Sequence, residues 1–178
     1  EVITKPYKAI INVVDRIDKE IGKRIFTLNL WIVEELVYIF AFIFNPLPIV
    51  TYLVSILYFC EFDLFVKVLI TTLSGLSFTL ISKKLLGRPR PLCLGNRKYN
   101  FRSVEKNNSM PSGDSLQSGL WATVLYLYFN VTYGFYVVPF VMFARCYYQC
   151  HFLSDTVVGA AIGILWTYMI KFAFKTAL

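Results

Sequence analysis

The sequence predicts an all-α membrane protein, a bundle of six transmembrane helices that follows an amphipathic N-terminal helix. Three observations lead to this prediction. Hydrophobic residues make up 57% of the 178 residues, and charged residues make up only 16%. The mean hydropathy of +0.57 is high for a soluble domain of this length. The apolar residues are gathered into six stretches, which polar residues or prolines separate from one another.

The first 27 residues differ from the rest because they are charged and periodic. Ile10, Val14, Ile17 and Ile21 recur at helical spacing, with charged residues between them. Such a helix either lies on the membrane surface or on a protein partner, or is an ordinary solvated helix before the first span. We therefore expect two units: an N-terminal segment over residues 1–27 and a membrane domain over residues 28–178.

The apolar stretches of the membrane domain lie near residues 28–44, 46–60, 64–85, 112–129, 133–150 and 155–174. Several are shorter than the ~20 residues that a membrane span usually needs, so flanking polar residues would have to extend these helices. Asn45-Pro46-Leu47-Pro48 breaks the first stretch from the second. Counting each stretch as one crossing gives six crossings and a multi-pass integral membrane protein.

One long polar segment, residues 87–111, interrupts this pattern, and its prolines and glycines predict a loop. Six crossings would place this loop, the helix ends beside it and the connection between the last two stretches on one face of the membrane. Chemically reactive side chains gather at these places: Lys83, Arg90, Ser112, Asp114, Arg145, His151 and Asp155. The topology therefore predicts one site built from residues that are far apart in the sequence.

The formal net charge of +7 raises the question of an anionic partner. No nucleic-acid-binding motif is present, so we expect anionic membrane lipids and an anionic substrate, and no nucleic acid. The basic N-terminal helix favours a cytosolic or matrix-like N-terminus. With six crossings, the reactive side chains would then lie on the opposite face from this helix.

The three basic side chains of the expected site suit a phosphate group. Arg90 and Arg145 each offer a planar fork for two oxygens, and Lys83 adds a point charge. Ser112-Gly113 opens the fourth apolar stretch, where free N–H groups at a helix N-terminus hold anionic oxygens. Each residue also has an ordinary structural explanation, such as a lysine at a helix end, but their shared face favours a site.

His151 is the only histidine in the chain. A neutral imidazole can attack phosphorus and form a phosphohistidine intermediate. Asp155 follows four residues later, a spacing that can bring its carboxylate to the other ring nitrogen, where it would stabilise the cation. Cys146 and Cys150 lie nearby, but their spacing matches no zinc pattern, so no metal site is expected.

Three motifs carry these residues in order: Lys83-x6-Arg90-Pro91, Pro111-Ser112-Gly113-Asp114 and Ala144-Arg145-x5-His151-x3-Asp155. Together they resemble the signature of the lipid phosphate phosphatases, also called type 2 phosphatidic acid phosphatases, in the superfamily that includes vanadium haloperoxidases. The resemblance covers roughly residues 28–174, and three spaced motifs are far more specific than one.

The resemblance implies a role for each motif residue. Lys83, Arg90, Arg145 and the backbone at Ser112 and Gly113 would bind phosphate, His151 would be the nucleophile and Asp155 its partner. The family acts mainly on lipid phosphates and diphosphates and needs no metal ion or other cofactor. The expected substrate is therefore a lipid phosphate or diphosphate in the surrounding membrane.

Two positions depart from the family pattern. Ala144 replaces a serine whose hydroxyl helps to bind phosphate. Asp114 replaces the histidine that usually protonates the leaving group. Three nearby cations would lower the pKa of Asp114, which would leave it ionised and unable to donate, whereas a bound phosphate dianion would raise that pKa. If Asp114 is ionised, a lipid diphosphate would be favoured over a monophosphate because a leaving phosphate needs less help.

Three functions remain open from the sequence. The first is a metal-independent lipid phosphate or diphosphate phosphatase that acts through His151 and is impaired by Asp114. The second is a weak or inactive family member that serves as a lipid-binding or structural subunit, with protein partners on its N-terminal helix. The third is a transferase that moves a phospho-headgroup between lipids.

Overall fold

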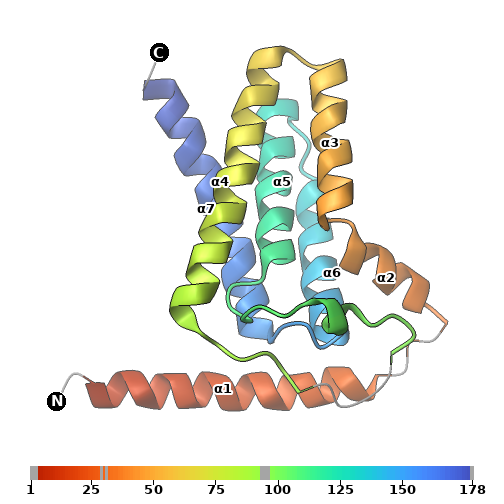
Figure 1. The fold of residues 1–178 in the computed structure, drawn as a ribbon, viewed down its shortest axis with the longest axis vertical. Helices are drawn as coiled ribbons and strands as arrows, with labels where there is room; N and C mark the ends of the chain where they lie inside the picture. The colour runs from red at the N-terminus through yellow and green to blue at the C-terminus, as the bar shows by residue number, and fades with distance from the viewer. Residues whose placement is uncertain (1–3, 29, 31, 93–96, 177–178) are drawn as a thin grey trace.

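The computed structural model describes residues 4–28, 30, 32–92 and 97–176, and over these residues it contains seven α-helices, one 3-10 helix and no strand (Figure 1). The all-α class is therefore confirmed. The elements in chain order are α1 (Thr4–Thr27), α2 (Glu34–Phe42), α3 (Pro46–Phe59), α4 (Phe62–Leu86), η1 (Phe101–Val104), α5 (Gly113–Phe129), α6 (Gly134–Tyr147) and α7 (Leu153–Thr176).

The break between the first two apolar stretches bends the chain but does not reverse it. Asn45 is extended, with ψ of 162°, and Pro46 starts the next helix. As a result α2 and α3 meet at 63° and form at most one broken span. The expected two antiparallel crossings in this region are wrong, because α2 has only nine residues, too few to cross a membrane.

This bend changes the face on which the N-terminal helix lies. Helix α1 runs across the end of the bundle where α4 ends and α5 begins (Figure 1). Its Asp18 contacts Arg88 of the loop after α4 and Ser154 of α7. The expectation that α1 and the reactive side chains lie on opposite faces is therefore wrong: they share one face.

Within the part of the chain that the structure describes, two helices, α4 and α7, are long and apolar enough to cross a membrane, and the α2–α3 pair can supply a third span. Their outward surfaces carry large exposed apolar side chains, among them Val50, Val54, Leu73, Leu80, Leu165 and Met169. Such surfaces suit lipid rather than water. The chain is therefore an integral membrane protein, and the expected count of six crossings is not confirmed, because α2 and α3 form at most one span.

Helix α5 forms the centre of the bundle. Ten consecutive residues, 115–124, are buried, so this helix is enclosed on all sides by its neighbours. Glycines allow its close approach to α7. A Cβ at Gly163 would lie 2.0 Å from the carbonyl oxygen of Leu116, and one at Gly119 would lie 2.4 Å from that of Ala160. This tight α5–α7 contact fixes the positions of the two motifs at the starts of these helices.

The helix ends that surround the polar loop are stabilised locally. Gly87 ends α4 in the left-handed conformation, with φ of 61°, and its N–H donates to the carbonyl of Lys83. Ser112 caps α5 by accepting from the N–H of Ser115. These two ends hold the Lys83 and Asp114 side chains at the same level of the bundle.

Candidate active site

The structure brings every predicted site residue to one end of the bundle. Lys83 ends α4, Arg90 follows in the loop, and Ser112, Gly113 and Asp114 begin α5. Arg145 lies in the last turn of α6, His151 in the connection that follows, and Asp155 in the first turn of α7. Lys83, Arg90, Ser112, Arg145, His151 and Asp155 are all buried. Their roles in binding and catalysis are proposals that this geometry supports.

An internal carboxylate occupies the centre of the site. Glu105, just after η1, forms ion pairs with both Arg90 and Arg145. Its Oε2 also lies 3.6 Å from Nε2 of His151. Two guanidinium groups from distant segments thus converge on one anionic group beside the only imidazole of the chain. The arrangement is an anion-binding pocket, and the Glu105 carboxylate stands where the oxygens of a phosphate group could bind.

Arg145 lies at the base of this pocket and is only 1% exposed. Its Nη2 lies 3.0 Å from Oδ2 of Asp114, and its Nη1 donates to the carbonyl of Ala41 at 3.3 Å. A buried guanidinium is costly unless it is paired. The ion pair with Glu105 therefore offsets part of the cost of burying Arg145, and Asp114 adds to this when it is ionised.

Arg90 and Lys83 share one partner that none of the three motifs includes. The side-chain oxygen of Asn107 accepts from Nη2 of Arg90 and, at 3.3 Å, from Nζ of Lys83. Arg90 also donates to the carbonyl groups of Asn107 and Cys150, at 2.7 and 2.6 Å. These bonds hold both cations over the pocket at fixed positions.

His151 is oriented by groups beside both ring nitrogens. Nη1 of Arg90 lies 3.2 Å from Nε2. Because a guanidinium can only donate, Nε2 accepts, and the ring proton of the neutral imidazole is assigned to Nδ1. Burial, followed by the charges of Arg145, Arg90 and Lys83, holds the pKa of His151 well below its usual range. The imidazole is therefore neutral at physiological pH, and its Nε2 faces the anion pocket.

Asp155 does not contact the imidazole as closely as the four-residue spacing suggested. Its Oδ2 lies 3.9 Å from Nδ1 of His151, too far for a hydrogen bond. The hydroxyl of Ser109 bridges the two, at 3.4 Å from Nδ1 and 2.5 Å from Oδ2. Ser109 therefore links the imidazole to the carboxylate.

The pKa of Asp114 is raised, although its cationic neighbours by themselves would lower it. Burial raises the pKa of Asp114 to about 7, against the opposing charges of Lys83 and Arg90. Desolvation thus outweighs the cations, although the side chain remains 16% exposed. At neutral pH a substantial part of Asp114 carries a proton that it can donate.

The start of α5 is less open to an anion than expected. The backbone N–H of Ser112 donates to the carbonyl of Asp155 at 3.0 Å, so it is not free in this structure. The Ser112 hydroxyl accepts the capping bond from Ser115. Gly113 lines the cavity that contains Asp114 and His151.

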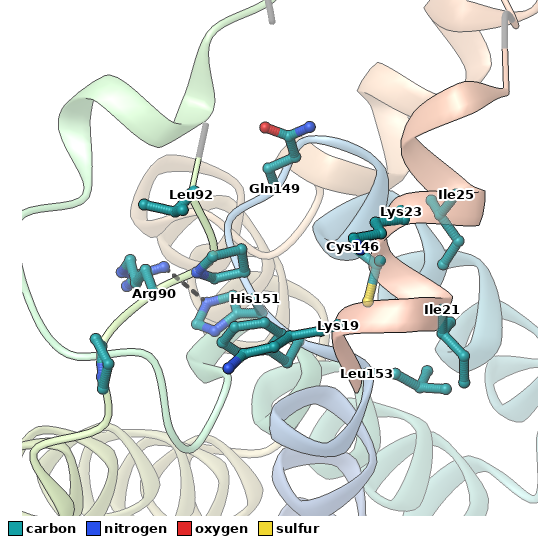
Figure 2. A pocket seen from close by; sticks show the side chains of 14 residues that line it. Lys19, Ile21, Lys23, Ile25, Arg90, Leu92, Cys146, Gln149, His151 and Leu153 are labelled. Carbon is teal, nitrogen blue, oxygen red and sulfur yellow. Dashed lines mark hydrogen bonds between the residues drawn. The ribbon is translucent and has the colours of Figure 1, made fainter. Parts of the chain in front are cut away.

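Two cavities reach His151 from different sides. One, of about 480 Å³, lies among α3, α4 and α5, and its walls are largely apolar, with Lys83, Glu105, Asp114 and His151 among its polar lining residues. The other, of about 510 Å³, lies between α1 and the loop at Arg90 (Figure 2). In Figure 2 the α1 side chains Lys19 and Ile21 border this second cavity together with His151. The imidazole therefore has access from the apolar bundle and from the α1 side.

The donor atoms of the site also raise the question of a metal ion. Ligand atoms of Glu105, Asp114 and His151 lie within 4.8 Å of one another. Both carboxylates, however, are already paired with arginines, and three cations surround the site. This donor set does not fit a cation, because the surrounding positive charge would repel it.

The structure adds Glu105, Asn107 and Ser109 to the predicted site. All three come from the long polar loop, whose length is itself typical of a functional segment. Their side chains contact Arg90, His151 and Asp155, as described above. No spacing rule marks such residues, because each acts through a contact made only in the folded chain.

Comparisons with known proteins identify the family and similar folds. The family model described as the PAP2 superfamily matches residues 64–177. The fold is similar to that of the transmembrane PAP2-type phosphatidylglycerolphosphate phosphatase from Bacillus subtilis, with a TM-score of 0.74 and 19% identity over 93% of this chain and 88% of that chain. It is also similar to LpxE from Aquifex aeolicus, with a TM-score of 0.68 and 22% identity over 85% of this chain and 92% of that one. No curated protein matches the sequence.

Proposed function

Because the chain belongs to the PAP2 superfamily, we propose that it is a lipid phosphate phosphatase in which His151 attacks phosphorus. The observation that carries this proposal is the Glu105 carboxylate held by Arg90 and Arg145 beside His151. A pocket that holds one anion next to a neutral imidazole can hold the phosphate of a substrate in the same way. The substrate phosphate would take the place of Glu105.

The first chemical step transfers the phosphoryl group to the enzyme. The Nε2 lone pair of His151 forms a bond to phosphorus as the bond from phosphorus to the lipid oxygen breaks. Arg90 and Arg145 stabilise the charge on the phosphoryl oxygens. The proton of Asp114 passes to the leaving oxygen, and Asp155, through Ser109, stabilises the positive charge that develops on the imidazole.

The second step returns the enzyme to its starting state. A water molecule attacks phosphorus, the bond to Nε2 breaks, and inorganic phosphate is released. The carboxylate of Asp114, now ionised, accepts the proton of this water, and His151 is again neutral. Every proton that leaves Asp114 in the first step therefore returns to it in the second.

The substrate class follows from the shape of the cavity among α3, α4 and α5. Its walls include apolar side chains of α3 and α4, and its polar end contains Lys83 and Asp114. An amphiphile with a phosphate head and a hydrocarbon chain matches this distribution, with the head at His151 and the chain between the helices. We assign the substrate to the lipid phosphates and diphosphates.

The experiment is phosphate release by the purified protein in detergent, from a lipid monophosphate and from a diphosphate of the same chain. His151→Ala should reduce the rate by about 10⁴-fold or more, because the nucleophile is lost. An acid-labile, alkali-stable phosphorylated protein should form with the wild type and be absent from His151→Ala. Release that persists in His151→Ala would exclude this mechanism.

A second function is favoured by two observations together. The Glu105 carboxylate fills the anion pocket, and Asp114 stands where the family has a histidine. A protein with these features could bind phospholipids without turning them over, as a subunit of a membrane assembly. Binding of a lipid phosphate that depends on Arg145, with no phosphate release from any substrate, would support this function instead.

A further inference from the structure

The orientation of Asp155 depends on a second charged group on its far side. While its Oδ2 faces Ser109, its Oδ1 accepts from Nη1 of Arg88 at 2.7 Å. The two oxygens of this carboxylate, which is fully buried, therefore have different partners: one belongs to the link with the imidazole and the other to Arg88. A change in the position of Arg88 would move the Asp155 carboxylate, which accepts from Ser109 and, through it, orients His151.

Arg88 is held in turn by helix α1. Its Nη2 donates to Oδ2 of Asp18 at 2.8 Å and to Oδ1 of Asp15 at 2.7 Å. Its Nη1 also donates to the hydroxyl of Ser154 at 2.7 Å. The guanidinium thus lies between carboxylates of α1 and the carboxylate of Asp155, which are far apart in the sequence.

Asp18 is the better anchored of the two aspartates on α1. It is only 3% exposed, whereas the Asp15 side chain is 42% exposed. Asp18 also accepts from the backbone N–H of Ser154 at 3.0 Å and from its hydroxyl at 2.5 Å. It therefore binds both Arg88 and Ser154, the residue that directly precedes Asp155 in the first turn of α7.

We propose that Asp18 is a positioning residue of the catalytic centre, which acts through Arg88 on Asp155 and so on His151. The negative charge of Asp18 balances Arg88, and its two bonds to Ser154 fix the start of α7. Without Asp18, Arg88 would interact more strongly with the carboxylate of Asp155. This carboxylate would then be a weaker hydrogen-bond acceptor for Ser109. The effect on turnover rests on the proposed function, but the effect on the imidazole does not.

The test uses the fact that His151 is the only histidine of the chain. Protein labelled with ¹⁵N-histidine and held in detergent gives one pair of ring nitrogen signals, which report tautomer and protonation. Asp18→Asn should shift these signals, and the matched control Glu20→Gln should not. Glu20 lies on the same helix, and its side chain is 58% exposed. Unchanged His151 signals in folded Asp18→Asn would overturn the proposal.

Kinetics separate positioning from substrate binding. Asp18→Asn should lower kcat about tenfold and leave KM within about twofold, because residues in one ion-pair network couple by such amounts. A rise in KM at unchanged kcat would contradict the proposal. If the wild-type protein releases no phosphate, the proposed function fails, and the histidine signals still decide whether Asp18 acts on His151.

Two further variants extend the test, and Arg88→Gln alone keeps it decisive if Asp18→Asn does not fold. Arg88→Gln, and the double variant that combines Asp18→Asn with Arg88→Gln, remove the same link from its other end. Both should shift the His151 signals, and the double variant should be no slower than Arg88→Gln alone. Unshifted signals in either variant, or additive losses of kcat, would overturn the proposal.

Discussion

Nη1 of Arg90 lies 3.2 Å from Nε2 of His151, so the arginine proposed to bind phosphate also covers the nitrogen proposed as the nucleophile. The same nitrogen atom of Arg90 pairs with Glu105. A substrate phosphate that displaces Glu105 would therefore compete for the Arg90 donor and uncover Nε2 in the same movement. In the proposed mechanism, this one guanidinium group would link phosphate binding to the exposure of Nε2.

Replacement of the internal carboxylate should strengthen anion binding. Glu105→Gln removes the charge that competes with phosphate for Arg90 and Arg145, so inorganic phosphate should inhibit at about tenfold lower concentration. The measurement is the inhibition constant of inorganic phosphate. Glu61→Gln, an equal change of charge at an exposed residue before α4, is the control and should have no effect. Weaker inhibition in Glu105→Gln would show that Glu105 is not a competitor.

The pH dependence should reveal Asp114. Its raised pKa, about 7, means that its proton is retained up to neutral pH. The kcat/KM for a lipid monophosphate should therefore fall as pH rises through about 7, and the lowered pKa of His151 adds no loss as the pH rises, because the imidazole is already neutral. Asp114→Asn should be slower and should lack this decline. A wild-type profile that is flat through neutral pH would exclude Asp114 as the proton donor.

Substrate preference should change with pH for the same reason. A leaving phosphate needs less protonation than a leaving alkoxide, so a lipid diphosphate should lose less activity above about pH 7 than a monophosphate of the same chain. The ratio of the two rates, measured from about pH 6 to about pH 9, should rise with pH. Asp114→His, which restores the family residue, should reduce this rise. A ratio that does not vary with pH would contradict the prediction.

Removal of the Ser109 hydroxyl should separate the imidazole from Asp155. Ser109→Ala should lower kcat about tenfold, because the direct distance of 3.9 Å is too long for a hydrogen bond. KM should change little, since the Ser109 hydroxyl bonds to the Asp155 carboxylate rather than to the arginines of the pocket. Ser103→Ala, at an exposed position of η1, is the control. An unchanged kcat in Ser109→Ala would mean that Asp155 reaches His151 without it.

The contact between α5 and α7 should tolerate no added methyl group. A Cβ at Gly163 would lie 2.0 Å from a backbone oxygen of α5, so Gly163→Ala should destabilise the fold by about 3 kcal/mol or more. The measurement is the thermal unfolding midpoint in detergent. Gly22→Ala is the matched control, because a Cβ there meets no atom within 4 Å. An unchanged midpoint for Gly163→Ala would show that the two helices can separate at little cost.

The fold class and the motif residues could be predicted because they depend on local signals. Apolar stretches mark helices, and the three motifs mark Lys83, Arg90, Arg145 and His151. The course of the chain at Asn45 could not be predicted, because a proline break is compatible with both a bend and a reversal of the chain. That single difference reversed the expected face of α1.

The remaining parts of the site depend on long-range contacts. Glu105 and Asn107 matter because the loop folds back over the pocket, and Asp18 matters because α1 docks on Arg88. The pKa of Asp114 depends on how deeply this side chain is buried, because burial raises the pKa and the nearby cations lower it. None of these quantities is encoded in a spacing of residues along the chain.

The position of α1 also indicates which side of the membrane would receive the product of the proposed reaction. Since this helix and the phosphate pocket lie at the same end of the bundle, the aqueous compartment that α1 contacts is the one that would receive the liberated phosphate. A protease that cannot cross the membrane, applied from one side to a vesicle, would locate α1 and with it the outlet of the reaction.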